Sequence, residues 1–450
     1  MQAADVRRVF EAILPDDLLR AFAEEAGLCQ RERKLDVVRL LRAMVIAAAT
    51  GYGGRQADAM RLYLHNTKER LSRGAFYRWF GPALEKVMAH VRERALEYAR
   101  AMKLDLPGLL GEHVTDWHIV DSSTVKLDKA FIEEYPGTGD YAALKLHKRF
   151  SVGIGTLLEY HLSPAREHDN VHLTIDESWR GLGVLLDLGY ASFKLLRDCA
   201  RCDVKYVIRL KEGWKPKVQH ISQGTVTSAF LAGTDLGALL ESETILLNGQ
   251  VVDCNVTFGR GAGEVGCRMV GVPTPEGTYR FYLTNLPSVV SPGQIADLYR
   301  VRWEIEMDNK LNKSLLHLDE ITARTGPALR AMIDASIVSS TIACILTHQH
   351  RLAEAPPPRT NRVRTKPPLH PQALALALGA SALRIADAME LRGKAAESEW
   401  ERLAAYLTNL GKDPNWRRSP SILDQLRGWE VGPGRPRKSK IASSIGATAN

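Results

Sequence analysis

The feature that most constrains the fold of this chain is a change in hydrophobic periodicity near residue 117. Residues 1–105 place apolar side chains at helical spacing, most clearly in the segment RKLDVVRLLRAMVIAAATGYG. From about residue 117 the pattern becomes that of three successive strands, after which helices and strands alternate. Three strands followed by such an alternation predict an α/β fold in which helices cover a mixed sheet.

Further changes of pattern divide the remainder of the chain. Short segments punctuated by Gly, Pro and Asn predict a β-rich insertion at about 213–285. A long helix is expected from Ser291 and another after Pro327, and the Pro- and Arg-rich stretch that follows reads as a linker. We therefore expect a helical domain at 1–105, a core at 106–350, a linker at 351–371, a helical segment at 372–430 and a disordered basic tail at 431–450.

Charge is distributed unevenly among these units. Residues 1–110 hold 19 basic and 14 acidic side chains, and residues 351–450 hold 17 and 9. The centre, 111–350, holds 24 basic and 29 acidic side chains. Basic flanks favour contact with a polyanion, and an acidic centre can gather carboxylates around metal ions, although scattered surface charge would give the same totals.

Several protein classes are excluded by what the sequence lacks. The longest apolar stretch, AMIDASIVSSTIACILT, contains Asp334 and several hydroxyls, which suits a buried helix and predicts no membrane span. The segment MQAADVRRVFEAILPDD does not resemble a secretion signal, so a cytoplasmic protein is expected. No GxxxxGK[ST] segment is present, which argues against a nucleotide cofactor. Cys199 and Cys202 have no second ligand pair nearby, which favours buried thiols over a zinc site.

Two short basic segments are candidates for DNA contact. Ser72 can cap a short helix that carries Arg73 and Arg78 among aromatic residues, as in a helix-turn-helix reader; a helical bundle with solvated arginines fits equally well. In the tail, Arg435 and Arg437 belong to PGRPRKSK, which resembles the core of an AT-hook that lies in a minor groove. A basic tail without sequence preference is the alternative reading.

Two aspartates follow apolar strands. Asp121 comes after IV, and Asp187 comes after VLL. Because functional groups in open α/β sheets gather at the carboxyl ends of strands, these side chains could lie side by side, although a single Asp there is more often a turn residue. A metal site would need a third carboxylate.

The long helix expected from Ser291 supplies that carboxylate on one of its faces. At about 100° per residue, one arc collects a carboxylate with basic and aromatic side chains, whereas Glu304 and Asp308 fall on the opposite side. Such a face is suited to holding phosphates beside a metal ion, with aromatic rings available to stack on bases. The residues on this arc are Tyr299, Arg302, Trp303, Glu306, Lys310 and Lys313.

The spacing Tyr-x2-Arg-x3-Glu-x6-Lys at 299–313 resembles the YREK signature of DDE transposases of the insertion-sequence-four family. The contexts DSSTVKL at Asp121 and DLGY at Asp187, and KLHKRFSVGI followed by LSPAREHDN, are similar to that family over about 115–350. The resemblance implies a ribonuclease-H-like core in which Asp121, Asp187 and Glu306 are the catalytic residues and hold two Mg²⁺ ions, with Mn²⁺ as a substitute. It also places His168, with the aspartate after it, near the active site, where a structural hydrogen bond between the two side chains is the alternative to contact with the metal ions.

The resemblance further implies a DNA partner and a reaction. Arg302 and Lys313 would bind phosphates at double-stranded transposon ends and target DNA, with Tyr299 beside them and Trp303 stacked on a base. Lys310 is a further candidate for DNA contact because it lies on the same expected helix face. The implied activity is cut-and-paste transposition at terminal inverted repeats, at the bacterial nucleoid, by a homodimer that the helices after residue 372 would join. A stand-alone metal-dependent nuclease and a non-catalytic DNA-binding repressor are the alternatives.

Overall fold

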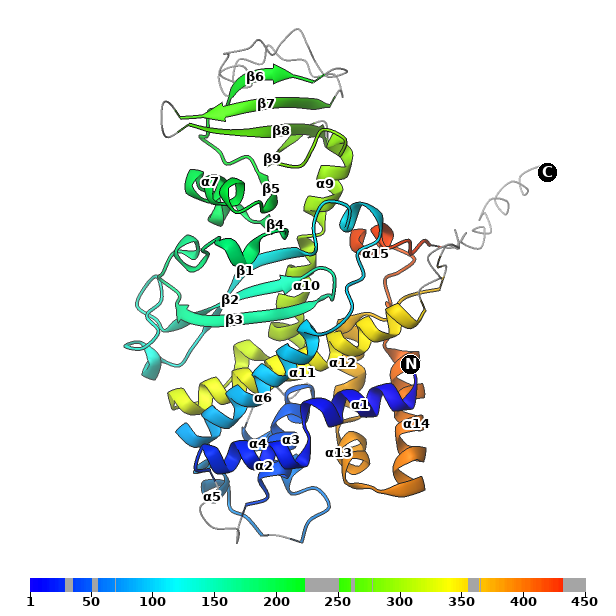
Figure 1. Ribbon diagram of the computed structural model, residues 1–450. Coiled ribbons are helices and arrows are strands. Elements are labelled where there is room, and N and C mark those ends of the chain that lie inside the picture. Colours follow the sequence, from blue (N-terminus) through cyan, green and yellow to red (C-terminus); the bar gives the residue numbers. More distant parts are fainter. Residues whose placement is uncertain are drawn as a thin grey trace, which may run out of the picture.

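The structure is a computed structural model that describes residues 1–28, 35–50, 56–68, 70–222, 251–259, 264–276, 278–354, 364 and 366–431. Arg435 and Arg437 of the basic tail lie outside the described residues, as do residues 355–363 of the expected linker. The described chain forms a mixed sheet that rises from a layer of helices (Figure 1).

Nine described strands form one sheet in the order β3-β2-β1-β4-β5-β9-β8-β7-β6. In the first half of the sheet, β2 is antiparallel to its neighbours β1 and β3. β4 runs parallel to β1, and β5 runs parallel to β4. This order and these directions are those of the expected ribonuclease-H-like core. The strands are β1 (Trp117–Lys126), β2 (Ala143–Ser151), β3 (Thr156–Pro164), β4 (Gly183–Leu186) and β5 (Lys205–Arg209).

The predicted β-rich insertion is present as strands, and these continue the core sheet. β9 pairs antiparallel with β5, and β8, β7 and β6 follow it outward with antiparallel pairing throughout. A buried ion pair between Arg268 and Asp253, 2.6 Å, joins two of these strands. The strands are β6 (Lys217–Ile221), β7 (Val252–Phe258), β8 (Val265–Pro273) and β9 (Tyr279–Thr284).

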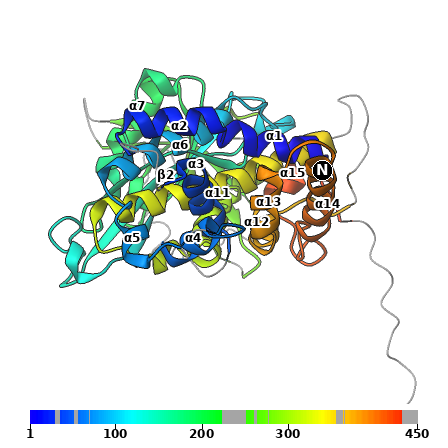
Figure 2. The ribbon, with the colours of Figure 1, turned by 90° about the horizontal axis from the view of Figure 1, so that it is seen from below.

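The helical layer joins the two ends of the chain. Helices from the amino-terminal and carboxy-terminal segments bury their apolar faces in one hydrophobic core around α11 (Gly326–Ala353). The amino- and carboxy-terminal helices therefore share one core with α11, although a linker was expected between α11 and the carboxy-terminal helices (Figure 2). The other helices of this layer are α1 (Ala3–Ile13), α2 (Asp16–Glu25), α3 (Val37–Ala48), α4 (Gln56–Tyr63), α5 (Arg73–Tyr77), α6 (Pro82–Arg100), α12 (Pro371–Ala380), α13 (Ala382–Glu390) and α14 (Gly393–Leu410).

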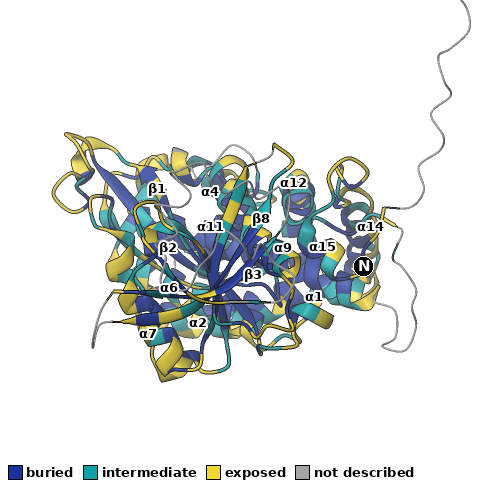
Figure 3. Ribbon diagram, turned by 90° about the horizontal axis from the view of Figure 1, so that it is seen from above, coloured by how far each residue is buried: buried dark blue, intermediate teal, exposed yellow. Residues whose placement is uncertain are grey.

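Helix α11 is a core helix. It is long and apolar enough to cross a membrane, yet 94% of its apolar window is buried within the protein (Figure 3). Its Asp334 accepts a hydrogen bond from Tyr160 of β3 and forms an ion pair with Arg92 of α6, 3.1 Å. A buried carboxylate paired in this way fits a protein interior, as the sequence predicted.

The long helix predicted from Ser291 is interrupted. Ser291 and Gln294 form a capping box at the start of α9 (Pro292–Arg300). Two residues separate α9 from α10 (Trp303–Lys310). Between them the amides of Val301 and Arg302 donate to carbonyls three residues back, which is the tighter 3₁₀ pattern. The chain turns further per residue there, so a single helical period cannot be carried from Tyr299 to Glu306. A π-helical turn (Leu311–Leu315) follows α10.

Candidate active site

The two strand-end aspartates lie next to each other. Val120 of β1 pairs with Leu186 of β4 in parallel register, so that Asp121 and Asp187 come next on adjacent strands. Both side chains are half-buried. Asp187 also precedes a 3₁₀ turn, η5 (Leu188–Tyr190), but its side chain makes no capping hydrogen bond there. Its carboxylate therefore remains available to a ligand.

Burial governs the charge of Asp121. It raises the pKa of the Asp121 carboxyl to about 6, and the neighbouring Asp187 adds to the rise. The Ser122 backbone amide and the Arg302 guanidinium oppose it. Asn309 of α10 donates a hydrogen bond to one carboxylate oxygen of Asp121, 3.2 Å. A nearby cation would stabilise the ionised form of this group.

Helix α10 brings the third predicted carboxylate to the same side of the sheet. Glu306 forms an ion pair with Arg302, 2.5 Å, and the Arg302 guanidinium also acts electrostatically on Asp121 and Asp187. Tyr299 is buried, its hydroxyl has no hydrogen-bond partner among the described residues, and its ring lies 5.8 Å from the Arg302 guanidinium. Burial raises the pKa of Tyr299 to about 12, so the hydroxyl stays protonated. It can therefore donate a hydrogen bond to an acceptor such as a phosphate.

The three carboxylates suit divalent cations by their chemistry. Carboxylate oxygens are the hard ligands that Mg²⁺ prefers, and Asp121 gains from a cation because its own burial disfavours its charge. The arrangement is open, however, because within the described ranges the only set of three ligand side chains within 4.8 Å of one another consists of histidines. Glu306 is instead engaged by the Arg302 guanidinium.

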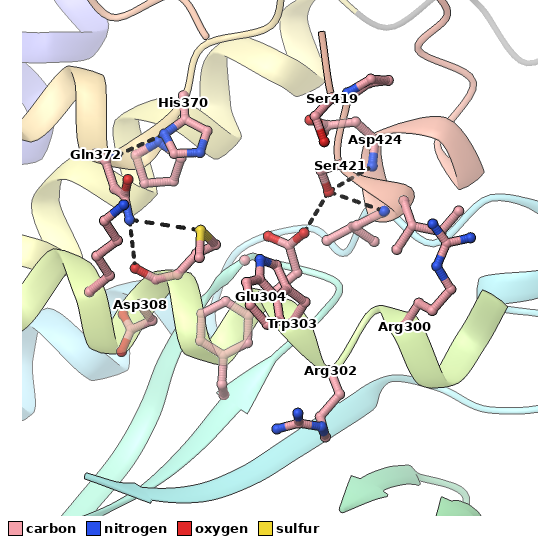
Figure 4. A pocket seen from close by; sticks show the side chains of 18 of the residues that line it. Arg300, Arg302, Trp303, Glu304, Asp308, His370, Gln372, Ser419, Ser421 and Asp424 are labelled. Carbon is pink, nitrogen blue, oxygen red and sulfur yellow. Dashed lines mark hydrogen bonds between the residues drawn. The ribbon is translucent and has the colours of Figure 1, made fainter. Parts of the chain in front are cut away.

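The other predicted residues of this face are distributed around α10. Lys313 lies near Asp121 and Lys148, and burial lowers the pKa of its amine. Lys310 is exposed, and Trp303 is 55% exposed, which leaves its ring free to meet a ligand. Both line a cavity of about 670 Å³ that opens beside the carboxylates (Figure 4).

This cavity contains basic side chains that the sequence did not single out. Asp187 and Arg302 line it, although Asp121 and Glu306 do not, so it lies beside the carboxylates. Arg209 ends β5 next to β4, and the strand-end rule that selected the aspartates would also have selected it. The exposed ones, suited to phosphate, are Arg209, Arg280, Arg300 and Arg418. Arg351 also lines the cavity, but it is buried and paired with Asp424.

Of the two acidic side chains expected on the far side of the helix, Glu304 lies there and Asp308 does not. Glu304 accepts a hydrogen bond from Ser421, 2.5 Å, near the start of α15 (Ile422–Leu426), whereas Arg302 points the other way (Figure 4). Burial and the neighbouring Asp424 raise the pKa of Glu304. Asp308 forms a buried ion pair with Lys148 of β2, 2.7 Å. Lys148 is directly opposite Asp121 on the sheet, so the expectation for Asp308 was wrong. The reason is that the 3₁₀ turn before α10 changes the helical phase. These side chains attach α10 to the rest of the protein.

The residues after β3 approach the site through Asp169. It accepts a hydrogen bond from Ser122, 2.8 Å, and pairs with Lys145, 2.9 Å. His168 itself is exposed. The aspartate of the His-Asp pair therefore contacts the residue next to Asp121, and the histidine does not.

The predicted reading helix is short. Ser72 caps α5 by accepting a hydrogen bond from the Ala75 amide, as expected. Arg73 and Arg78 are both exposed, and α5 lies at the outer part of the helical layer, away from the strands (Figure 1). Any DNA that these arginines touch would extend well beyond the carboxylates.

Comparison with known proteins places this geometry in a family. The model of the transposase DDE domain matches residues 115–342, half of the chain, which includes both aspartates and α10. The transposase of insertion sequence element IS231C from Bacillus thuringiensis subsp. berliner is 24% identical over 241 residues, 44% of this chain and 50% of that protein. The transposase of insertion sequence element IS421 from Escherichia coli is 44% identical over 59 residues, 13% of this chain and 16% of that protein.

The chain thus spans half or less of these curated relatives. Among solved structures, the piggyBac transposase synaptic complex with hairpin DNA aligns with 91% of this chain and 86% of its own, at 12% identity and a TM-score of 0.47. Because the domain model covers half of the chain, including the sheet and helix that carry the acidic residues, this protein belongs to the transposase DDE domain family.

Proposed function

We propose that this protein is the transposase of an insertion sequence of the insertion-sequence-four type, and that it excises and reinserts its element by cut-and-paste transposition. The observation that carries the proposal is the meeting of Asp121 and Asp187, on adjacent parallel strands, with the Arg302–Glu306 pair of α10. This meeting lies within the matched DDE domain. The YREK spacing at 299–313 supports the finer family assignment.

In this proposal Asp121, Asp187 and Glu306 hold two Mg²⁺ ions, which Mn²⁺ can replace. When bound, these ions supply the activation of a water or 3′-hydroxyl and the stabilisation of the departing oxygen. Glu306, which pairs with Arg302 in this structure, would be the third ligand, and the Arg302 guanidinium would then be available to a phosphate. Lys313 adds a second cation beside that phosphate.

The remaining side chains of the site orient the DNA. The Tyr299 hydroxyl, which has no partner among the described residues, donates a hydrogen bond to a phosphate oxygen. The exposed Trp303 ring stacks on a base. Lys310 and the arginines of the adjacent cavity track the backbone away from the cleavage point. The partners are double-stranded transposon ends and target DNA, held by a homodimer through the helices after residue 372, at the nucleoid of a bacterial cytoplasm.

The first test is cleavage of the DNA that flanks the gene. If the gene belongs to a mobile element, inverted repeats border it, and the purified chain should cut at those repeats with Mg²⁺ or Mn²⁺ present. Chelation should abolish cutting and leave most of the DNA binding. Cutting that ignores the repeats would establish the nuclease instead, and specific binding without cutting under either metal would establish the repressor.

A second prediction separates positioning of DNA from recognition of its sequence. Lys313→Ala should weaken binding equally on cognate and scrambled ends and reduce the log–log salt slope by about 0.9, because it removes one phosphate contact. Arg73→Ala or Arg78→Ala should cost roughly 1–3 kcal/mol on the cognate end alone if α5 reads bases. Salt titrations of binding to both DNAs provide the measurement.

These substitutions are made in the full chain, because the amino-terminal helices share a core with α11 and their removal would expose it. Arg180→Ala serves as a control for a lost surface charge, since Arg180 is exposed and pairs only locally with Glu177. Equal losses on the two DNAs for both arginine variants of α5 would refute the reading role.

A further inference from the structure

Three histidines that the proposed reaction does not use meet on the core sheet. His147 belongs to β2, His161 to β3 and His172 to the 3₁₀ turn η3 (Asp169–His172). One ligand atom of each lies within 4.8 Å of one from each of the others. This is the only such group of histidine, cysteine or acidic side chains within the described ranges.

The register of the sheet separates this cluster from the carboxylates. Across β1, β2 and β3, Ser122 faces His147, which faces His161, and these residues share one face of the sheet. The next row, from Asp121 through Lys148, lies on the opposite face, where Lys148 meets Asp308 of α10. The histidines therefore make a site of their own on the other side of β2.

Hydrogen bonds already orient two of the rings. His172 Nε2 contacts a Glu167 carboxylate oxygen, 2.9 Å, and His147 Nε2 contacts the Ser163 hydroxyl, 2.8 Å. If each of these nitrogens carries the proton, the Nδ1 atoms of both rings present lone pairs. A carboxylate behind a histidine is the usual outer partner of a metal ligand.

One of these two lone pairs has no partner. His147 is 3% exposed, and its Nδ1 is buried without a hydrogen bond among the described residues. His172 Nδ1 forms a hydrogen bond of 3.1 Å with His161 Nε2, which a bound ion would replace. Two nitrogens bound to one tetrahedral Zn²⁺ at about 2.0–2.1 Å stand about 3.3 Å apart, so this separation is close to that of a ligand pair.

The surroundings of His147 and His161 disfavour the protonated form of these two imidazoles. Burial and the two neighbouring rings lower the pKa of His147 to about 3, and burial with His172 lowers the pKa of His161. Three carboxylates act on the cluster in the opposite sense, Asp169 on His147 and both Glu159 and Glu167 on His161, and all would favour a cation.

We propose that His147, His161 and His172 bind one transition-metal ion of the Zn²⁺ class, at a site distinct from the carboxylates that would take Mg²⁺. Imidazole nitrogens select Zn²⁺, Co²⁺ or Ni²⁺ over Mg²⁺, so the two sites divide their metals by ligand chemistry. The His147 ring now stacks on both others, with centroids 4.6 and 4.0 Å away. Because imidazole lone pairs lie in the ring planes, the rings would have to turn out of this stack to hold one ion together.

The bound ion would fix the segment after β3 to the sheet. Through His172 it would tie η3 to β2 and β3. The first residue of η3, Asp169, accepts a hydrogen bond from Ser122, the residue that follows Asp121. The site is therefore structural and supports the position of the strand end that carries Asp121. The plain alternative is a stack of three neutral imidazoles that packs without any ion.

Metal titration of the untagged full chain tests this proposal. After treatment with a chelator, the chain should bind one equivalent of Co²⁺ with the absorption of a nitrogen-ligated site, and Zn²⁺ should displace it. His161→Ala and His172→Ala should each weaken binding at least about tenfold. His168→Ala and Asp121→Asn should bind as the wild type does, because His168 is exposed outside the cluster and Asp121 lies on the other face.

Thermal unfolding gives an independent readout. Zn²⁺ should raise the melting temperature of the wild type and of His168→Ala, and leave that of His161→Ala unchanged. Because His161 is exposed, its replacement leaves the core intact, which circular dichroism checks. Wild-type affinity in both cluster variants, no binding by the wild type, or a cobalt–thiolate band would each overturn the proposal.

Discussion

Asp121→Asn should reduce strand cleavage by about a thousandfold or more, which corresponds to at least about 4 kcal/mol of transition-state stabilisation. The proposed chemistry depends on metal ions, and an amide is a much poorer ligand than the carboxylate it replaces. Asp187→Asn and Glu306→Gln should behave in the same way. Binding of the cognate DNA should change little, since phosphate contacts come from basic residues. The measurement is cleavage and binding of one end fragment under identical conditions.

Glu304→Gln is the matched control on the same helix. Glu304 lies two residues before Glu306 but faces Ser421 on the far side of α10. Its substitution should leave the cleavage rate within a few-fold of the wild type. A dead Glu304→Gln beside an active Glu306→Gln would falsify the assignment of the third carboxylate.

The same Asp121 substitution should make the metal-free protein more stable. Burial raises the pKa of Asp121 from 3.8 to about 6, so the folded state disfavours the ionised form. The stabilising effect of this shift is complete below pH 3.8 and is lost as the pH rises through 6. With a chelator present, the gain from Asp121→Asn should be small near pH 4 and about 1–3 kcal/mol at pH 8. Urea unfolding at the two pH values measures it.

The sequence predicted the two aspartates of this site for reasons that the fold preserves. Asp121 and Asp187 follow apolar strands, and parallel pairing brings such positions together whatever the rest of the sheet does. The choice of Glu306 over Glu304 stays a prediction. The helical period from Tyr299 on which it was based is broken before Trp303, and what favours Glu306 in the structure is that Glu304 bonds Ser421 whereas Glu306 pairs with Arg302.

Contacts between distant segments could not be predicted in this way. Asn309 meets Asp121, and Glu304 meets Ser421, across 188 and 117 positions of sequence. His147 and His161 face each other only because of one particular register between β2 and β3. A shift of that register by one residue would move one of the two rings to the other face. The Pro- and Arg-rich composition predicted a linker at 351–371. Nothing in that composition indicated that α11 before it and the helices after it share one core.

The second large effect is expected at the buried ion pair between Lys148 and Asp308. The two side chains are 1% and 4% exposed, lie 2.7 Å apart, and join β2 to α10. Lys148 is directly opposite Asp121 in the β1–β2 register, so the pair fixes the helix that carries Glu306 against the strand that carries Asp121. Lys148→Met would leave the Asp308 charge buried without its partner, and the expected loss of unfolding free energy is about 3–5 kcal/mol.

A double-mutant cycle distinguishes an unpaired charge from lost packing. Asp308→Leu alone should cost a similar amount, whereas Lys148→Met with Asp308→Leu should cost clearly less than the two together, because apolar side chains replace both charges. Asp297→Ala provides the matched control, since its pair with Arg300 on the neighbouring α9 is exposed and should contribute less than about 1 kcal/mol. Additive losses in the cycle would mean that the pair does not couple the helix to the sheet. Cleavage by the double variant then reports whether α10 still presents Glu306 to the aspartates once the ion pair is gone.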